Sequence, residues 1–250
     1  MTKCHPDADD RMFGAEGFNH TECISTSYTH MINKRVHIIG GGTVSHVRNH
    51  LALAAPAYGH TARRLAVLAT ERFPAMDVCL HLTKMADPDS VLETAEDVRV
   101  FTRSLVDDTR TKVVFFNAAI VDYAGRVDDV ESQKYATRLS TADGARTIDA
   151  TPIPKIIDGI RNEAGASGVR KDIFLVAFKT TCGATEEEQY RAGLNMLKRA
   201  SANLVLANDT VTRRNMIITP EEAAYHVTLD RDEALRNVVD MAYLRSHLMF

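Results

Sequence analysis

Three long apolar runs constrain the fold of this chain more than any other feature. The first reads KVVFFNAAI at residues 112–120, the second DIFLVAFKT at 172–180, and the third ANLVLA at 202–207. Strands that lack polar alternation are buried on both faces, as in a parallel sheet covered by helices. Segments with helical spacing of apolar residues separate these runs. The sequence therefore predicts an α/β protein, with a Rossmann-like three-layer fold, a mainly parallel sheet and a small flap or hairpin excursion.

The N-terminal half of this pattern predicts a glycine turn between a strand and a helix. A short strand ends in Gly40–Thr43, and apolar residues then recur at helical spacing over about residues 51–69. Ser90 precedes another helical stretch, with Glu93 three residues later, which is the spacing of a capping box. We therefore expect a helix that is capped at Ser90.

The C-terminal half predicts one irregular segment among regular elements. Residues 123–150 are polar, so we expect an excursion with at most short strands. Pro152 and Pro154 are expected to introduce a helix to about residue 164. An acidic helix is expected over about 184–200, because its first glutamates suit the positive end of a helix dipole. Two short strands and a helix after Asp230 complete the pattern.

The composition indicates one folded domain with a tail. The chain has 250 residues and a formal net charge of −3, so there is no basic excess for nucleic-acid binding. No apolar run approaches the roughly 18 residues of a membrane span, and the polar N-terminus does not resemble a signal peptide. We expect a cytoplasmic protein with no nucleic-acid or membrane partner. Residues 1–34 are expected to form a flexible tail, and residues 35–250 the α/β domain.

The four cysteines lie far apart and are expected to be free thiols in a reducing compartment. Cys4, His5, His20 and Cys23 could be written as a zinc set. Their spacing is irregular, whereas zinc ligands normally come in tightly spaced pairs. We therefore favour a flexible tail and expect no metal bound by protein side chains.

Unusual residues gather where the predicted strands end. Right-handed crossovers place the carboxyl ends of parallel strands at one edge of the sheet, where ligands bind. Four such segments are expected there: Gly40–Thr43, Asn117–Tyr123, Phe178–Thr181 and Asn208–Asp209. The sequence therefore predicts a ligand site at this edge.

Each of these residue types supports a functional and a structural interpretation. A glycine turn can present N–H groups to a phosphate, or it can simply be a tight turn. Asp122 could hold a nucleotide hydroxyl, an amine or Mg²⁺, or it could be a loop residue. Lys134 and Arg138 could close over phosphates, or be solvated cations. Lys198 near a helix C-terminus can also complement the dipole.

The order of these motifs resembles the phosphopantothenate–cysteine ligase family, also called phosphopantothenoylcysteine synthetase. The resemblance spans about residues 35–248. The matching segments are a G-G-T after the first strand (41–43), A-A-x-x-D-Y (118–123), a lysine-bearing flap (134–138), a T-P helix start (151–157), the strand end A-F-K-T-T (177–181) and K-x-x-x-x-x-x-x-x-x-N-D (198–209).

The resemblance implies a reaction in coenzyme A biosynthesis. CTP or ATP, with Mg²⁺, activates a carboxylate as an acyl-nucleotidylate and pyrophosphate leaves. The amine of cysteine then attacks to form an amide. The resemblance also implies small-molecule partners and a homodimer in which each site takes residues from both subunits.

The resemblance further implies three groups of site residues. Those at the nucleotide are expected to be Gly41, Gly42, Thr43, Ala119, Asp122, Phe178, Lys198, Asn208 and Asp209. The catalytic cations of the flap are expected to be Lys134 and Arg138. The substrate-binding candidates are Arg48, Asn49, Tyr58 and Gly59.

Two departures from the family pattern point to altered chemistry. The family carries N-x-S-S-G where this chain has Ala55-Pro56-Ala57-Tyr58-Gly59, so its Asn and Ser residues are absent. Thr181 stands where the family has Glu. We therefore expect a ligase that acts on the usual or an altered substrate. The alternatives are a non-catalytic nucleotide-binding pseudoenzyme and, more distantly, a nicotinamide or flavin oxidoreductase.

Overall fold

The computed structural model describes residues 34–128, 130 and 132–249. The predicted tail, apart from Lys34, lies outside the described residues, as do Cys4, His5, His20 and Cys23. Cys79 and Cys182, the two cysteines within them, are free thiols. No helix in the described part of the chain is long and apolar enough to cross a membrane.

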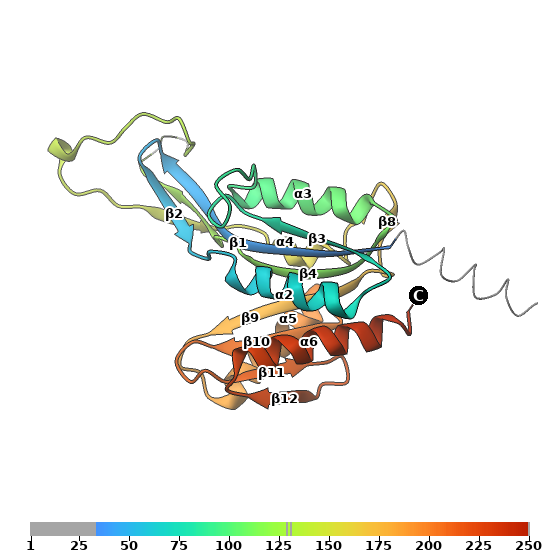
Figure 1. Cartoon of the computed structure of the whole chain (residues 1–250). Helices are drawn as coiled ribbons and strands as arrows, with labels where there is room; N and C mark the ends of the chain where they lie inside the picture. The colour runs from blue at the N-terminus through green and yellow to red at the C-terminus, as the bar shows by residue number, and fades with distance from the viewer. Residues whose placement is uncertain (1–33, 129, 131, 250) are drawn as a thin grey trace, which may run out of the picture.

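One eight-stranded sheet forms the centre of the molecule (Figure 1). Its strands are β1 (Arg35–Arg48), β2 (Leu51–Ala55), β3 (Asp77–Leu82), β4 (Thr111–Ala119), β9 (Phe174–Thr181), β10 (Leu204–Asp209), β11 (Asn215–Ile218) and β12 (Ala224–Thr228). The five strands β3, β1, β4, β9 and β10 lie side by side in this order and are parallel. The antiparallel strands β11 and β12 complete one edge. The predicted α/β fold is confirmed.

Helices cover both faces of the sheet and bury its apolar runs (Figure 1). Helices α2 (His60–Arg72) and α6 (Arg231–Ser246) pack on one face. Helices α3 (Ala95–Asp107), α4 (Ile156–Gly159) and α5 (Glu186–Ala200) pack on the other. The central residues of β4 and β9 are buried between these layers, because neither face of either strand reaches solvent. This burial explains the apolar runs of the sequence.

The strand order creates a crevice at the carboxyl edge of the sheet. The chain passes from β1 outward to β3 and then back across β1 to β4, so the winding direction reverses between β1 and β4. Loops diverge at such a switch point and leave room for a ligand. The fold therefore places the glycines of β1 and the ends of β4 and β9 where the sequence predicted a site.

The predicted glycine turn is wrong, because β1 continues through the glycines to Arg48 and then reverses into β2. The first helix accordingly begins at His60 and not near residue 51. A Cβ on Gly40 would lie 2.2 Å from the Cβ of Ala62 in α2. Gly41 has φ +101°, which favours glycine. These glycines thus allow a helix to pack tightly on an extended strand.

The predicted cap at Ser90 is also wrong, because α3 begins four residues later. Thr94 caps the helix by accepting a hydrogen bond from the Asp97 N–H at 3.2 Å. The Asp97 carboxylate accepts the Thr94 N–H at 2.8 Å, which completes a capping box. Ser90 instead donates its hydroxyl to the Leu82 carbonyl at 2.6 Å, so it belongs to the loop after β3.

The predicted helix after Pro154 is a single turn, α4 (Ile156–Gly159). It gives way to a two-residue hairpin of β7 (Ala164–Gly165) and β8 (Gly168–Val169). Gly168 has φ +78° at its turn, a backbone conformation that does not continue a helix. The acidic helix α5 is confirmed, with Thr185 and Glu188 forming its capping box.

The predicted excursion projects from the sheet as an arm (Figure 1). The arm comprises the outer half of β1, strand β2 and the hairpin of β5 (Tyr123–Arg126) and β6 (Asp149–Pro152). Its tip carries one short 3₁₀ helix, Thr141–Asp143. The flap expected from the sequence is therefore a two-hairpin arm, rooted on β1 and on the end of β4.

Candidate functional site

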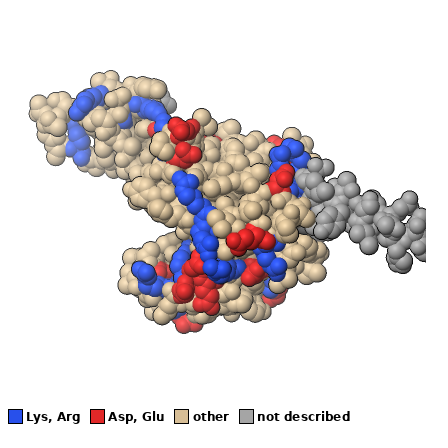
Figure 2. All heavy atoms as spheres, viewed as in Figure 1, with Lys and Arg blue, Asp and Glu red and all other residues tan. Residues whose placement is uncertain are grey.

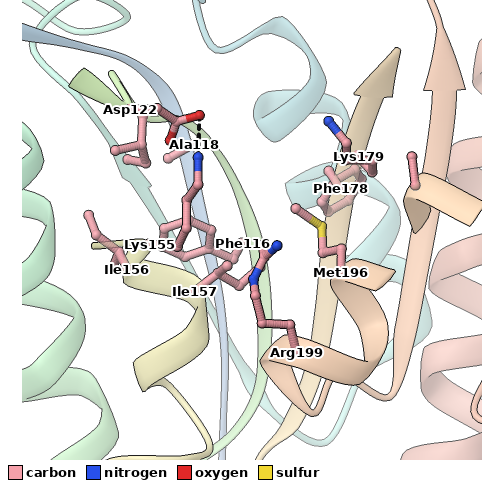
Figure 3. Close-up of a pocket in the computed structure, with 12 residues that line it drawn as sticks. Phe116, Ala118, Asp122, Lys155, Ile156, Ile157, Phe178, Lys179, Met196 and Arg199 are labelled. Atoms are coloured by element: carbon pink, nitrogen blue, oxygen red, sulfur yellow. Dashed lines mark ion pairs between the residues drawn. The ribbon is translucent and has the colours of Figure 1, made fainter. Parts of the chain in front are cut away.

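A cavity of about 200 Å³ lies on the α3–α4–α5 side of the sheet, at the ends of β4 and β9 (Figure 3). Its apolar walls include Phe116 from β4, Phe178 from β9 and Met196 from α5. These strands bring Phe116 and Phe178 together because both side chains follow buried runs of neighbouring parallel strands. The cavity therefore offers aromatic surface for a planar ligand.

Charged groups surround this apolar centre. Lys155 precedes α4, Lys179 lies near the end of β9, and Arg199 lies on the last turn of α5. Asp122 is the single carboxylate among the described residues that line the cavity. Three cations facing one carboxylate favour a ligand that carries negative charge.

Asp122 and Lys155 form an ion pair across the cavity, with Nζ 2.5 Å from Oδ2 (Figure 3). Both side chains are partly exposed, so solvent weakens this pair and a ligand can replace either partner. The Asp122 carbonyl accepts the Ile153 N–H at 2.9 Å. This bond fixes the backbone of Asp122 at the root of the arm.

Two of the cavity cations are held by neighbours. Arg199 donates two hydrogen bonds from Nε to Asp158, at 2.9 and 2.7 Å from its two carboxylate oxygens. Lys179 donates to the Thr180 carbonyl at 3.0 Å. Lys155 and Arg199 were not predicted as site residues. A signal for Arg199 existed in the sequence, because Ala192, Met196 and Arg199 follow the helical spacing of one face.

The structure thus brings two predicted nucleotide residues together, Asp122 and Phe178. Ala119 is the last residue of β4, and Thr43 lies within β1 next to it. The buried Thr43 hydroxyl donates to the Ala119 carbonyl at 3.3 Å and accepts the Val121 N–H at 2.9 Å. Thr43 therefore ties the switch point together and shapes the segment that leads to Asp122.

Other parts of the chain fill the space next to Gly41 and Gly42 in β1. The Gly42 N–H donates to the Ala57 carbonyl at 2.7 Å, and a Cβ on Gly42 would lie 2.1 Å from the Ala55 carbonyl oxygen. A Cβ on Gly41 would lie 2.2 Å from the Thr83 hydroxyl. Segment 55–59 therefore packs directly on the glycines, and the Gly42 N–H is already satisfied without a phosphate.

Asn208 and Asp209 serve the loops that follow β9 and β10. Buried Asp209 accepts backbone N–H groups of Gly183, Ala184, Val211 and Thr212 at 2.8–3.1 Å. These bonds, the Thr212 N–H first, hold the pKa of Asp209 well below its usual range. The Asn208 amide oxygen accepts the Thr180 hydroxyl at 3.2 Å. Both residues therefore shape the sheet edge beside the cavity.

Lys198 points to a different partner. Its Nζ lies 2.6 Å from Glu222 in the turn between β11 and β12. Lys198 is not among the described residues that line the cavity, whereas the adjacent Arg199 is. One step along a helix turns a side chain by about 100°, which separates the two cations.

A second, larger hollow lies between the arm and α3. This groove has a volume of about 780 Å³ and shares Ile156 with the cavity, so the two spaces adjoin. Lys134 from the arm lines the groove and forms an ion pair with Glu93. Its hydrogen bond to Glu93 raises the pKa of Lys134 and lowers that of Glu93. Arg138 is exposed farther along the arm.

The predicted substrate residues are not gathered in one place. Buried Arg48 donates to the carbonyls of Val47 and Val127 at 2.8 Å each, which joins the two hairpins of the arm. The Asn49 N–H donates to the Ala136 carbonyl at 3.2 Å. Tyr58 is 63% exposed, and Gly59 precedes α2 with φ 76°.

The charge distribution also marks the arm. Figure 2 shows Lys and Arg side chains along the projecting arm, with acidic side chains at its root.

No group of three or more His, Cys, Asp or Glu residues within the described residues could hold a metal ion. These side chains therefore provide no protein cage for a metal.

Comparison with known proteins links these features to one family. No family model matches the chain. The coenzyme A biosynthesis bifunctional protein CoaBC of Thermococcus kodakarensis is 27% identical over 180 residues, which cover 70% of this chain and 41% of CoaBC. The chain thus spans about two-fifths of the length of this relative.

Solved structures show the same fold at identities below one in five. The DNA/pantothenate metabolism flavoprotein from Streptococcus pneumoniae aligns with a TM-score of 0.67 and 17% identity, covering 86% of this chain and 99% of that one. The C-terminal domain of a CoaBC protein aligns with a TM-score of 0.62 and 18% identity, covering 85% and 95%. A Cab2 mutant in complex with phosphopantothenate-cysteine aligns with a TM-score of 0.58 and 16% identity, covering 91% of each chain.

Motif order, sequence relative and fold therefore agree. In sequence the chain is similar to CoaBC, and it has the fold of the CoaBC C-terminal domain and of Cab2.

Proposed function

We propose that this protein is a nucleotide-dependent carboxylate–amine ligase of the phosphopantothenate–cysteine type, possessing a nucleotide site in the cavity at the ends of β4 and β9. The observation that carries the proposal is the meeting of Asp122 and Phe178 in that cavity, beside Lys155 and Arg199. An aromatic wall suits a base, a carboxylate suits a ribose hydroxyl, and the cations suit phosphates.

The proposed reaction has two steps. A carboxylate oxygen of the acid attacks the α-phosphorus of CTP or ATP, and pyrophosphate leaves with the electron pair of the broken P–O bond. The amine of cysteine then attacks the acyl carbon, an amide forms, the nucleoside monophosphate leaves and the amine loses a proton. Because a carboxylate is a poor electrophile, the first step supplies the leaving group that the second step needs.

The protein's part in this chemistry is positioning and charge neutralisation. The base and ribose would occupy the cavity between Phe178 and Asp122. The phosphates and the acid would extend past Ile156 into the groove, where Lys134 lies. Lys134 would stabilise the negative charge that develops on the phosphate oxygens in the first step.

Mg²⁺ would enter with the nucleotide and be held chiefly by phosphate oxygens, as is usual for this ion. It would neutralise charge on the leaving pyrophosphate. We further propose that the protein works in the cytoplasm and as a homodimer, in which the projecting arm reaches the partner subunit.

Pyrophosphate release tests the proposal. Wild-type protein with Mg²⁺ is given CTP, ATP, GTP or UTP together with 4′-phosphopantothenate and cysteine, and the products are identified by mass spectrometry. We expect release with CTP or ATP that requires both the acid and the amine. If release occurs only with another acid, the ligase chemistry stands and the usual substrate is excluded.

A non-catalytic nucleotide-binding protein is the second candidate. It is favoured by the closure of Gly42 by segment 55–59, since this segment lacks the Asn and Ser residues of the family. In that case the protein binds CTP or ATP, seen as a thermal shift, yet releases no pyrophosphate over a panel of acids and amines. An unchanged melting temperature with every nucleotide would contradict both candidates.

A further inference from the structure

Glu93 occupies an electrostatic centre that neither the sequence motifs nor the family resemblance pointed out. Its carboxylate forms an ion pair with Lys134, lies 3.3 Å from Nε2 of His46 and 3.8 Å from Nζ of Lys84. The three partners come from the arm, from β1 and from the loop after β3. One carboxylate thus lies close to basic side chains from three separate segments, at the wall of the groove.

The backbone around Glu93 is fixed on both sides. Its carbonyl accepts the Val44 N–H at 3.0 Å, and its N–H donates to Asp97 at 3.2 Å. The preceding carbonyl of Leu92 accepts the Lys84 N–H at 2.8 Å. The backbone of Glu93 therefore cannot move far without breaking contacts to β1 and to the first turn of α3.

Lys134 has no comparable rigidity of its own. A lysine side chain has several rotatable bonds, and ordering it costs conformational entropy. The backbone near Lys134 is held by a hydrogen bond from the Asn49 N–H to the Ala136 carbonyl at 3.2 Å. This bond does not fix the orientation of the Lys134 ammonium group. The ion pair with Glu93 supplies that orientation and points Lys134 into the groove.

We propose that Glu93 is a positioning residue: it acts as a resident counter-anion that holds Lys134 in the groove and is exchanged for a phosphate group of the incoming substrate. The kinetic part of this proposal rests on the proposed ligase function, while the contact and the exchange do not. Loss of the carboxylate would leave three basic groups without their shared anion, so that anions bind better. It would also release Lys134 from its working position.

Amine labelling tests the contact without any assumption about the reaction. Wild-type protein and the Glu93→Gln variant are treated with limiting acetic anhydride at mildly alkaline pH, and acetylation of Lys134 is measured by peptide mass spectrometry. We expect several-fold faster labelling in the variant, because Glu93 raises the pKa of Lys134. An unchanged rate would overturn the contact.

Pyrophosphate binding tests the exchange. We expect the Glu93→Gln variant to bind inorganic pyrophosphate several-fold more tightly than wild type by calorimetry. Glu96→Gln is the matched control, because Glu96 lines the same groove on the first turn of α3 but pairs with Arg99. Equal affinity in wild type and Glu93→Gln, or an equal gain in both variants, would refute a specific role of Glu93.

Kinetics test the positioning. We expect Glu93→Gln to lower kcat about tenfold while the KM for the nucleotide stays equal or falls. Glu93→Asp, which keeps the charge, should recover part of kcat. In a Lys134→Met background the Glu93→Gln change should have no further effect on kcat, since Glu93 acts through Lys134. An undiminished kcat in Glu93→Gln, or a full tenfold loss in the Lys134→Met background, would overturn the positioning role.

The outcomes separate this proposal from the proposed function. If wild-type protein releases no pyrophosphate under any condition, the ligase function fails, yet labelling and pyrophosphate binding still decide whether Glu93 holds Lys134. A thermal melt of each variant confirms folding, and Glu93→Asp provides the second carboxylate variant if Glu93→Gln does not fold.

Discussion

The β1 side and the β4–β9 side of the same sheet edge are built in opposite ways. On the β1 side, segment 55–59 lies against the glycines and the Gly42 N–H is satisfied by the Ala57 carbonyl. On the β4–β9 side, an open cavity is lined by aromatic and charged side chains. The Gly42 N–H is satisfied inside the fold, whereas the cavity charges, such as the partly exposed pair of Asp122 and Lys155, remain accessible to a ligand. Under the proposed function, this contrast predicts a site whose nucleotide half is kept more fully than its other half.

The largest expected effect tests whether the β1 side is closed by packing. Gly42→Ala would place a Cβ 2.1 Å from the Ala55 carbonyl oxygen, so segment 55–59 must move. We expect the free energy of unfolding to fall by about 3 kcal/mol. The measurement is urea denaturation.

Gly144→Ala is the control for Gly42→Ala. Gly144 has open space around it but φ +81°. The free energy of unfolding should therefore fall by about 1 kcal/mol in Gly144→Ala, from backbone strain alone. Equal losses in the two variants would mean that steric closure at Gly42 is unimportant.

A smaller effect concerns the pH stability of the β1 side. His37 on β1 and His81 on β3 are stacked, with Nδ1 and Nε2 2.9 Å apart, and burial lowers the pKa of both to about 4. A lowered folded pKa means that the unfolded chain binds protons first. Stability is therefore full above about pH 6.5 and is lost as the pH falls toward 4.

The pH prediction is a loss on the order of 2 kcal/mol between pH 7 and pH 5.5, measured by denaturation at each pH. His37→Leu should flatten this dependence, whereas His60→Gln, at an exposed position of α2, should leave it unchanged. A wild-type stability that does not change over this range would show that the pair does not stay neutral in the fold.

The smallest effect sharpens the β4–β9 side of the comparison. Arg199→Met removes a cation that lines the cavity, and we expect nucleotide affinity to fall about tenfold, or about 1.4 kcal/mol. Lys198→Met removes the neighbouring cation, which pairs with Glu222, and should change affinity less than about twofold. Isothermal titration of CTP and ATP gives both values. A larger loss of affinity in Lys198→Met would support Lys198, which the family resemblance favoured, as the cation that contacts the nucleotide.

The fold could be predicted because its signal is local. The runs at 112–120 and 172–180 are apolar at every position that the sheet buries, and Thr185 with Glu188 signals the start of α5 directly. The errors arose where two local signals competed. Ser90 and Thr94 both satisfy a capping pattern, and in the structure Thr94 caps the helix while the Ser90 hydroxyl donates to the Leu82 carbonyl after β3.

The candidate site was only partly predictable for a similar reason. Asp122 follows β4 and Phe178 lies near the end of β9, and both strands were predicted to end at the same edge of the sheet, so their meeting could be expected. Arg199 and Lys155 enter the same cavity from helices whose rotation and length depend on packing. The pattern around Lys198 pointed to the last turn of α5, where the structure places Arg199 and not Lys198 in the cavity wall. The nucleotide role of Lys198 stays a prediction.

The sequence by itself determined the α/β class and the parallel centre, and it predicted the edge at which the candidate site lies. Burial on both faces requires apolar runs, and parallel strands must end on the same side. Only the tertiary structure decided that Gly40–Thr43 continue a strand, that segment 55–59 closes Gly42, and that Glu93 meets Lys134. Each of these depends on contacts between segments far apart in the chain. The sequence alone does not show whether the N–H of a glycine or the ammonium group of a lysine already has a partner in the fold.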